Sequence, residues 1–416
     1  MELPAATSLA VPFLATIVVL AHEGGRCWAT SACCRASSRR TARWRPSAEA
    51  ARLVLKTHDA ALADRPPGTA AGAILSYGCR GILLSPRGAH WRMARRLCAT
   101  QLFSARRVDQ FERAREEETR ALVRGVFERC GAAVEVREHL ERCAMWNILR
   151  MAVGERWPGL YDSKEGEAVY KTSLDVVFAM TGAMDTDSNV GAWVPWMGRL
   201  DVQGLIGRMK RVHERLDRFY EQILVEHEEE RRRRAGGGDG DGDIAGKGTL
   251  VDVLLQLLAE EEEEDEESET RLTRDGVKGM IQDIVTGGTD TTAATMEWAL
   301  ASCSPASWPD LPCAFRPERF LPGGGAAHGV DVRGKHFELL PFGTGRRMCP
   351  GYGLAMKEMA GTLANLLLGF AWRLPDGTAP EDLSMEEFFG MSVRRAAPSQ
   401  SPGCRRTSTP LRRSRG

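Results

Sequence analysis

The stretch that most constrains this chain is a loop around one cysteine, Phe342-Gly-Thr-Gly345-Arg-Arg-Met-Cys-Pro-Gly351. Its glycines permit a tight turn, so the backbone can pass close under a flat ligand. Arg347 offers a planar guanidinium, which grips a carboxylate with two hydrogen bonds. The residues after Cys349 predict a helix that begins at the sulfur, and its N-terminal dipole would temper the charge of a thiolate. These features suit a thiolate that ligates the iron of a haem. A half-buried structural thiol is the alternative interpretation of Cys349.

A second constellation lies in a long helix predicted from about residue 273 to residue 301. Its middle reads Gly287-Gly288-Thr-Asp-Thr-Thr, and glycine and β-branched residues are poor helix formers. We therefore expect the hydrogen-bond ladder to open here and make room for a small ligand. Asp290 offers a carboxyl that can supply a proton, and Thr291 offers a hydroxyl that can pass it on. Taken alone, the stretch also fits a surface helix with Thr and Asp caps.

The two constellations, in this order, resemble the motifs of the cytochrome P-450 monooxygenases. The loop resembles the haem-ligand motif Phe-x-x-Gly-x-Arg-x-Cys-x-Gly, and the helix resembles the oxygen-activation motif Ala/Gly-Gly-x-Asp/Glu-Thr-Thr/Ser. The resemblance implies that Asp290 and Thr291 are catalytic and that Cys349 is the metal ligand. It implies a cofactor-binding set made of Trp91, Arg95, Gly287, Gly288, Phe342, Gly345, Arg347, Cys349 and Gly351.

Weaker elements of the same family accompany these motifs. Trp91 and Arg95 resemble its Trp-x-x-x-Arg, which packs against the haem ring and pairs with the propionates. Phe315-Arg-Pro-Glu-Arg319-Phe320 resembles its Pro-Glu-Arg-Phe element, where Arg319 would join a buried ion network. The sequence between the motifs, for example Leu102-Phe-Ser-Ala-Arg-Arg107, is similar to that of plant microsomal enzymes of the flavonoid 3′-hydroxylase-like group.

The resemblance implies a mainly α fold with a small β portion, the P-450 fold. It implies haem b as cofactor and O2 as co-substrate, with electrons from NADPH through a partner flavoprotein reductase. The expected reaction is hydroxylation of a small apolar or phenolic molecule of secondary metabolism. Balanced charge, with 56 basic and 56 acidic residues, gives no general field for nucleic acid, so we expect no nucleic-acid partner. No Cys-x-x-Cys pair occurs, which argues against a zinc site.

One expected part of the fold is missing from the sequence. In the family, a segment with the Glu-x-x-Arg helix and the pocket strands follows the oxygen-activation helix. Here the sequence that resembles the residues before Pro-Glu-Arg-Phe begins within a few residues of Ala301, so that segment is absent. Arg319 would then lose its partners, and an unpaired buried charge costs about 3–5 kcal/mol. We therefore expect an incomplete fold, and the alternative function is an inactive, membrane-associated remnant that holds no haem.

The remaining boundaries follow from composition. An apolar run from about Ala5 to Ala21 predicts a membrane anchor over residues 1–21, while a cleaved signal peptide is disfavoured because the first residues carry Glu2 and no Lys or Arg. Residues 22–47 form an irregular basic segment, which places the following body in the cytoplasm. With the resemblance to microsomal enzymes, this predicts the endoplasmic reticulum membrane. The haem-binding domain spans 48–392, with a flexible Gly/Asp linker at 235–248, and 393–416 is an irregular basic tail.

Overall fold

The computed structural model describes residues 47–65, 70–131, 134–154, 204–236, 248–262, 271–302 and 330–372, and the short stretches 384, 386–388, 392–396, 400–401 and 405–406. Helices dominate this part of the chain, as expected for a mainly α fold. The longer ones are α5 (Ala89–Leu97), α7 (Glu112–Glu128), α8 (Val136–Ala152), α11 (Leu205–Gly236), α13 (Leu250–Glu262), α14 (Arg274–Ser302) and α15 (Tyr352–Gly369). The shorter ones are α2 (Ala48–Arg52), α3 (Asp59–Leu62), α4 (Ala70–Ile74) and α6 (Ala105–Gln110), with π-helical turns at Leu53–Thr57 and Cys98–Leu102.

The described β portion is small. The strands are β1 (Val134–Glu135), β2 (Phe370–Ala371), β3 (Glu387–Phe388), β4 (Arg394–Arg395), β5 (Gln400–Ser401) and β6 (Arg405–Arg406). They form three antiparallel pairs, β1 with β5, β2 with β6 and β3 with β4. The pairs β1–β5 and β2–β6 join the end of the chain to segments far away in the sequence.

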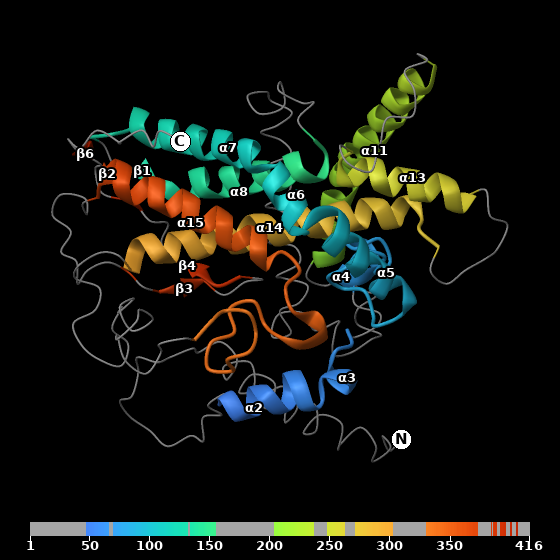
Figure 1. Cartoon of the computed structure of the whole chain (residues 1–416), viewed down its shortest axis with the longest axis horizontal. Coiled ribbons are helices and arrows are strands. Elements are labelled where there is room, and N and C mark those ends of the chain that lie inside the picture. The colour runs from blue at the N-terminus through green and yellow to red at the C-terminus, as the bar shows by residue number, and fades with distance from the viewer. Residues whose placement is uncertain are drawn as a thin grey trace, which may run out of the picture.

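The centre of the molecule is built from α7, α8, α14 and α15, which lie side by side (Figure 1). Helix α14 packs along α8 and also contacts α11, α13 and α15. Buried apolar side chains of α8 and α14, among them Met145, Met280 and Ile281, belong to the larger core cluster. A smaller cluster joins α7, α8, α14 and α15 through residues such as Val126, Leu140 and Leu366. Helix α14 therefore has neighbours on several sides, which holds its residues in fixed positions.

Side-chain caps set the starts of two of these helices. Thr273 precedes α14, and its hydroxyl oxygen accepts the Gly276 N–H at 3.1 Å. Thr273 therefore caps the start of α14. Before α13, the Thr249 hydroxyl accepts the Asp252 N–H at 3.2 Å, and the Asp252 carboxylate accepts the Thr249 N–H at 2.8 Å. That reciprocal pair satisfies two backbone donors which the helix itself cannot use.

The expected opening in the middle of α14 does not occur. The segment from Gly287 to Thr292 stays α-helical without interruption. The hydroxyl of Thr289 donates to the Val285 carbonyl at 2.7 Å, and that of Thr291 donates to the Gly287 carbonyl at 2.7 Å. These hydroxyls bond back onto the helix, and packing against α8 outweighs the low helix propensity of the residues. The prediction of a broken ladder was wrong.

Buried ion pairs connect α14 with α8 and with strand β4. Arg137 of α8 donates two hydrogen bonds to the Glu297 carboxylate, at 2.9 and 3.0 Å. Arg394 and Arg395 of β4 are themselves buried, and Arg394 lies 3.3 Å from Glu141 of α8. Residues 394–395 are therefore part of the packed structure, although we expected the irregular tail to begin at residue 393.

Several sequence predictions fall outside the described residues. These are the anchor at 1–21, the basic segment at 22–46, Arg319 with its Pro-Glu-Arg-Phe element, and most of the linker at 235–248. Helix α11 continues through the first two linker residues, to Gly236. In the described part of the chain, no helix is both long enough and apolar enough to cross a membrane.

Candidate functional site

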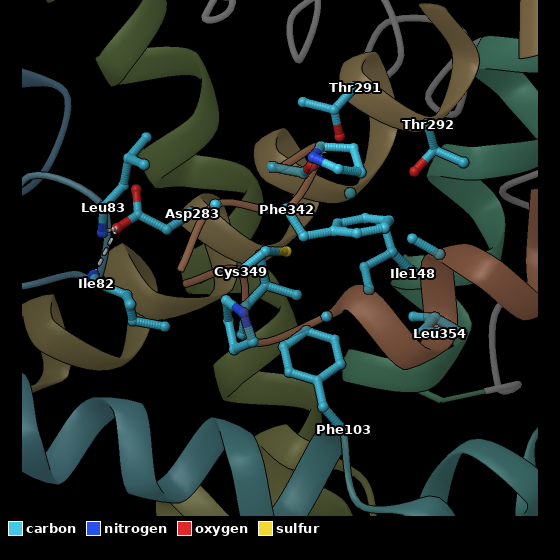
Figure 2. Close-up of a pocket in the computed structure, with 18 of the residues that line it drawn as sticks. Ile82, Leu83, Phe103, Ile148, Asp283, Thr291, Thr292, Phe342, Cys349 and Leu354 are labelled. Atoms are coloured by element: carbon cyan, nitrogen blue, oxygen red, sulfur yellow. Dashed lines mark hydrogen bonds between the residues drawn. The ribbon is translucent and has the colours of Figure 1, made fainter. Parts of the chain in front are cut away.

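A cavity of about 720 Å³ lies between α14, α5, α15 and the cysteine loop. Figure 2 shows Cys349 and Phe342 on one side of it and Thr291 of α14 on another. Its volume is that of an ordinary small-molecule or cofactor site. Eight of the nine predicted cofactor-binding residues line it: Trp91, Arg95, Gly287, Gly288, Phe342, Arg347, Cys349 and Gly351. The predicted catalytic residue Thr291 lines it as well.

Gly345 does not line the cavity, but it fixes the shape of the cysteine loop. Its φ is 72°, in the left-handed region that favours glycine, and it opens a 3₁₀ turn over Gly345–Arg347. A Cβ at this position would lie 2.5 Å from the Leu55 carbonyl oxygen and 2.8 Å from the Asp59 carboxylate. Asp59 in turn pairs with Arg346 at 2.5 Å. The glycine is therefore required for the loop to dock on the N-terminal helices.

Cys349 supplies the thiol in the cavity wall. Its own N–H donates to the Phe342 carbonyl at 2.9 Å, which closes the loop. Burial raises the pKa of the Cys349 thiol, while the Gly351 N–H and the positive charge of Arg95 act in the opposite direction. A metal ion bound to the sulfur would favour the thiolate strongly. The geometry thus offers one sulfur ligand, a donor next to it and a nearby cation.

Two guanidiniums are held at the cavity by an aromatic ring and backbone carbonyls. Arg347 lies 4.3 Å from the centre of the Trp91 ring, and Arg95 lies 5.5 Å from it. Arg347 donates to the carbonyls of Ala63 at 2.8 Å and Ser85 at 2.7 Å, and Arg95 donates to that of Met348 at 2.6 Å. Burial and, to a smaller extent, the charge of Arg65 lower the pKa of Arg347 to about 10. An anion bound beside these cations would relieve that cost.

The fit of a haem can be tested on a buried donor. The Trp91 side chain is 5% exposed, yet its Nε1–H has no hydrogen-bond partner among the described residues. A buried donor without a partner costs free energy, so a missing acceptor is indicated. A haem propionate would supply a carboxylate beside Trp91, Arg95 and Arg347. On the facing wall, a Cβ at Gly287 would meet no atom within 4 Å, so the helix leaves open space there.

Asp290 lies on a different face of α14 from Thr291. Its side chain is 1% exposed in total and does not line the cavity. Its carboxylate lies 2.5 Å from Arg394 and also accepts the Ser392 hydroxyl. Adjacent residues of a helix do not share a face, which is why the structure separates the two members of the predicted catalytic pair. Gly288 allows Ile148 of α8 to pack closely, because a Cβ at this position would lie 3.2 Å from the Ile148 side chain.

Sequence reasoning missed three ionisable residues of the cavity wall, Arg65, Asp283 and Glu358. Asp283 precedes Gly287 by four residues, so helical spacing could have placed it on the cavity face. Glu358 lies nine residues after Cys349 on α15 and accepts a hydrogen bond from the Asn147 amide at 3.0 Å. Burial raises its pKa to about 8, against the lowering effects of Asn147 and Arg115. Arg65 carried no motif that could have singled it out.

The family model for cytochrome P450 matches residues 46–305 and 302–399. The chain belongs to the cytochrome P450 family. It is similar to two enzymes of Zea mays, trimethyltridecatetraene synthase and dimethylnonatriene synthase, each at 50% identity. Each alignment takes in 85% of this chain, with 78% of the first relative and 80% of the second. Flavonoid 3′-monooxygenase of Arabidopsis thaliana is 29% identical over 85% of this chain and 80% of its own.

The fold agrees with the family. A zebrafish cytochrome P450 structure with progesterone has a TM-score of 0.62 at 16% identity, covering 84% of this chain and 90% of that one. Cytochromes P450 are haem-thiolate monooxygenases, so this chain is identified as a monooxygenase of plant secondary-metabolism type. The flavonoid 3′-hydroxylase-like resemblance holds only at a distance, because the maize relatives share far more identical residues than the flavonoid enzyme does.

We predict that Glu358→Gln makes the protein more stable at pH 8 than the parent. In the parent, the unfolded state loses the carboxyl proton above about pH 4.5, whereas the folded state keeps it up to about pH 8. Stability therefore falls as pH rises through this window, by at most about 5 kcal/mol for such a shift. The amide cannot ionise, so the difference between variant and parent should grow from pH 5 to pH 8. Urea unfolding at both pH values measures it.

Glu116→Gln is the matched control, because Glu116 is an exposed α7 carboxylate paired with Arg120. It should change stability by less than about 1 kcal/mol at either pH. An equal effect of Glu358→Gln at pH 5 and pH 8 would contradict the assignment of a neutral buried carboxyl.

Proposed function

We propose that this cytochrome P450 oxidises an acyclic, methyl-branched isoprenoid. The observation that carries the proposal is the 50% identity to two maize enzymes whose names denote branched polyene hydrocarbons. Their eleven- and sixteen-carbon skeletons are not whole numbers of five-carbon isoprene units. An enzyme that forms such products from isoprenoid precursors has to break a carbon–carbon bond. The cavity supports a substrate of this kind, because Ile82, Leu83, Ile148 and Ile284 give it an aliphatic wall.

Hydroxylation of a small phenol, the expectation from the flavonoid 3′-hydroxylase-like wording, is the second candidate. It is favoured by relatives named flavonoid 3′-monooxygenase at 28–30% identity over most of the chain. A phenol hydroxyl would need a polar partner in the wall, and Thr292 and Thr295 of α14 offer hydroxyls there. The larger identity to the maize enzymes puts the isoprenoid first.

In the proposed reaction, each residue of the site has a separate role. Cys349 is the proposed haem ligand, and Trp91, Arg95 and Arg347 hold the carboxylates on its rim. When bound, haem supplies a thiolate-ligated iron that activates O2. Thr291 is placed at the cavity to hold or pass a proton through its hydroxyl. Asp290 remains the proposed proton source, although its carboxylate first has to leave Arg394 and Ser392. The apolar wall excludes water from the substrate.

The electron source and location follow the same proposal. We infer that a flavoprotein reductase passes electrons from NADPH, and that the protein is held at the endoplasmic reticulum membrane by residues 1–21 with its body in the cytoplasm. The domain limits of 48–392 for the catalytic body remain part of this proposal. The family and its plant relatives support these assignments.

We further propose that a segment is missing near Ser302. The family model matches in two stretches that meet at residues 302–305. The alignment with the first maize relative runs over 437 positions although it takes in only 85% of a 416-residue chain, so the relative has residues opposite gaps in this one. In addition, α15 exposes Leu367 at 43%, an apolar side chain of a kind that usually packs against a neighbour.

The first prediction concerns the haem ligand. The purified chain, reduced and exposed to carbon monoxide, should show the strongly red-shifted Soret band of a thiolate-ligated haem. Cys349→Ser should lose that band, because a hydroxyl is a poor iron ligand, while Cys79→Ser should keep it, since Cys79 is a half-buried cysteine away from the cavity. A parent spectrum without haem would instead support the inactive remnant.

The second prediction concerns the substrate. With reductase and NADPH, membranes containing the protein should convert fifteen- or twenty-carbon acyclic isoprenoid alcohols to shorter hydrocarbons, detected by gas chromatography with mass spectrometry. A flavanone offered in parallel should remain unchanged because the aliphatic wall gives its ring hydroxyls few partners. Hydroxylated flavanone together with intact isoprenoid would make the second candidate the function.

The third prediction concerns the segment. Inserting the corresponding residues of the maize trimethyltridecatetraene synthase after Ser302 should raise both the haem content and the melting temperature, because it would cover the apolar side chains of α15. An insertion of equal length made of Gly and Ser is the control and should raise neither. Full haem content in the parent, unchanged by the insertion, would show that the chain is complete in this region.

A further inference from the structure

We propose that Asp283 is a positioning residue that holds one wall of the cavity against α14. The wall is the segment Gly81-Ile-Leu-Leu-Ser85, called the strap here, whose Ile82 and Leu83 side chains line the cavity. This inference deepens the proposed function, because it rests on the haem site described above. In this proposal the Asp283 carboxylate, which belongs to neither of the sequence motifs, helps to set the shape of the substrate cavity.

The contact between Asp283 and the strap is direct. The carboxylate is buried, with the residue 6% exposed, and one of its oxygens accepts the N–H of Ile82 at 2.6 Å and that of Leu83 at 2.8 Å (Figure 2). Hydrogen bonds to a charged acceptor are stronger than neutral ones, and two of them from adjacent residues fix the orientation of the backbone. Asp283 thus uses one carboxylate oxygen to hold a segment about 200 residues earlier in the chain.

The local sequence allows the strap to lie flat on the helix. A Cβ at Gly81 would collide with the Asp283 carboxylate and would lie 3.0 Å from the Gly279 carbonyl oxygen. A Cβ at Gly279 would lie 3.3 Å from the Gly81 nitrogen. Two glycines therefore face each other where the strap crosses α14, and their backbones approach more closely than any side chain would permit. The carboxylate lies next to this crossing.

The other side of the strap carries the cations of the haem site. Its carbonyls accept from Arg347, at 3.3 Å for Ile82 and 2.7 Å for Ser85. The Leu83 carbonyl accepts from Arg65 at 3.0 Å. The strap thus gives its N–H groups to an anion on α14 and its carbonyls to cations on the other side. Hydrogen bonds aligned in this way polarise one another, so loss of the anion should loosen both sides.

Hydrogen exchange of the strap amides tests the inference with a readout that does not depend on haem. In Asp283→Asn the acceptor oxygen remains but its charge is gone, so the Ile82 and Leu83 amides should exchange about tenfold faster than in the parent, as expected when a charged hydrogen bond becomes neutral. Asp275→Asn is the matched control, since Asp275 is an exposed carboxylate in the first turn of the same helix. It should leave exchange in the strap unchanged.

Ligand binding to the haem-loaded protein tests the consequence for the cavity. Imidazole binding reports on the iron alone, whereas 1-hexylimidazole also contacts the wall. Asp283→Asn should weaken 1-hexylimidazole by about tenfold, the scale of an apolar group that loses its fitted pocket, and leave imidazole and the carbon monoxide spectrum unchanged. Gly81→Ala, which pushes the strap away from an intact Asp283, should reproduce this pattern.

The outcomes separate the two levels of the proposal. Strap amides that exchange at the parent rate in Asp283→Asn, or an unchanged ratio of the two azole affinities in both variants, would overturn the positioning role. A parent without a thiolate-type carbon monoxide spectrum would overturn the haem site, and the exchange experiment would still decide whether Asp283 holds the strap. If Gly81→Ala does not fold, the Asp283→Asn result decides alone.

Discussion

The guanidinium of Arg347 is the point at which the separate parts of the site are held together. It bonds to the carbonyls of Ala63, directly after α3, and of Ile82 and Ser85 in the strap, and it stacks on Trp91 of α5. The residue itself belongs to the cysteine loop. A planar, permanently charged group with several donors can make all these contacts at once, which a lysine could not. Its position two residues before Cys349 therefore fixes the sulfur relative to the cavity.

Helix α14 forms the facing side of the cavity, and its orientation is fixed because its different faces contact different partners. One face, with Gly287, Thr291 and Thr295, borders the cavity. Another carries Asp290 and Glu297, whose carboxylates pair with arginines of β4 and α8. A buried carboxylate stripped of its cation costs several kcal/mol, so these pairs prevent the helix from turning about its axis. The cavity face keeps its direction because the opposite face is tied down.

The cysteine loop was predictable from the sequence because its chemistry is local. Phe342, Gly345, Arg347 and Cys349 lie within eight residues, and a turn, a cation and a sulfur ligand can each be inferred from residue type. The strap and Glu358 were not predictable in this way. Asp283 accepts a hydrogen bond from Ile82, which lies 201 positions away in the sequence. The sequence of a helix does not show which distant backbone N–H groups one of its carboxylates will bind. The continuity of α14 was missed because propensity was weighed without the packing of α8.

The separation of Asp290 from Thr291 changes how proton supply has to be viewed. A motif read as a pair suggests two side chains acting together, yet helical geometry points them to different faces. The Asp290 carboxylate is bound to Arg394 in a strand near the end of the chain, and Thr291 bonds back to the Gly287 carbonyl. Both side chains must change partner before a proton can pass from one to the other. Under the proposed role of Asp290 as proton source, the hold of β4 on α14 therefore opposes proton transfer, and loosening that strand would favour it.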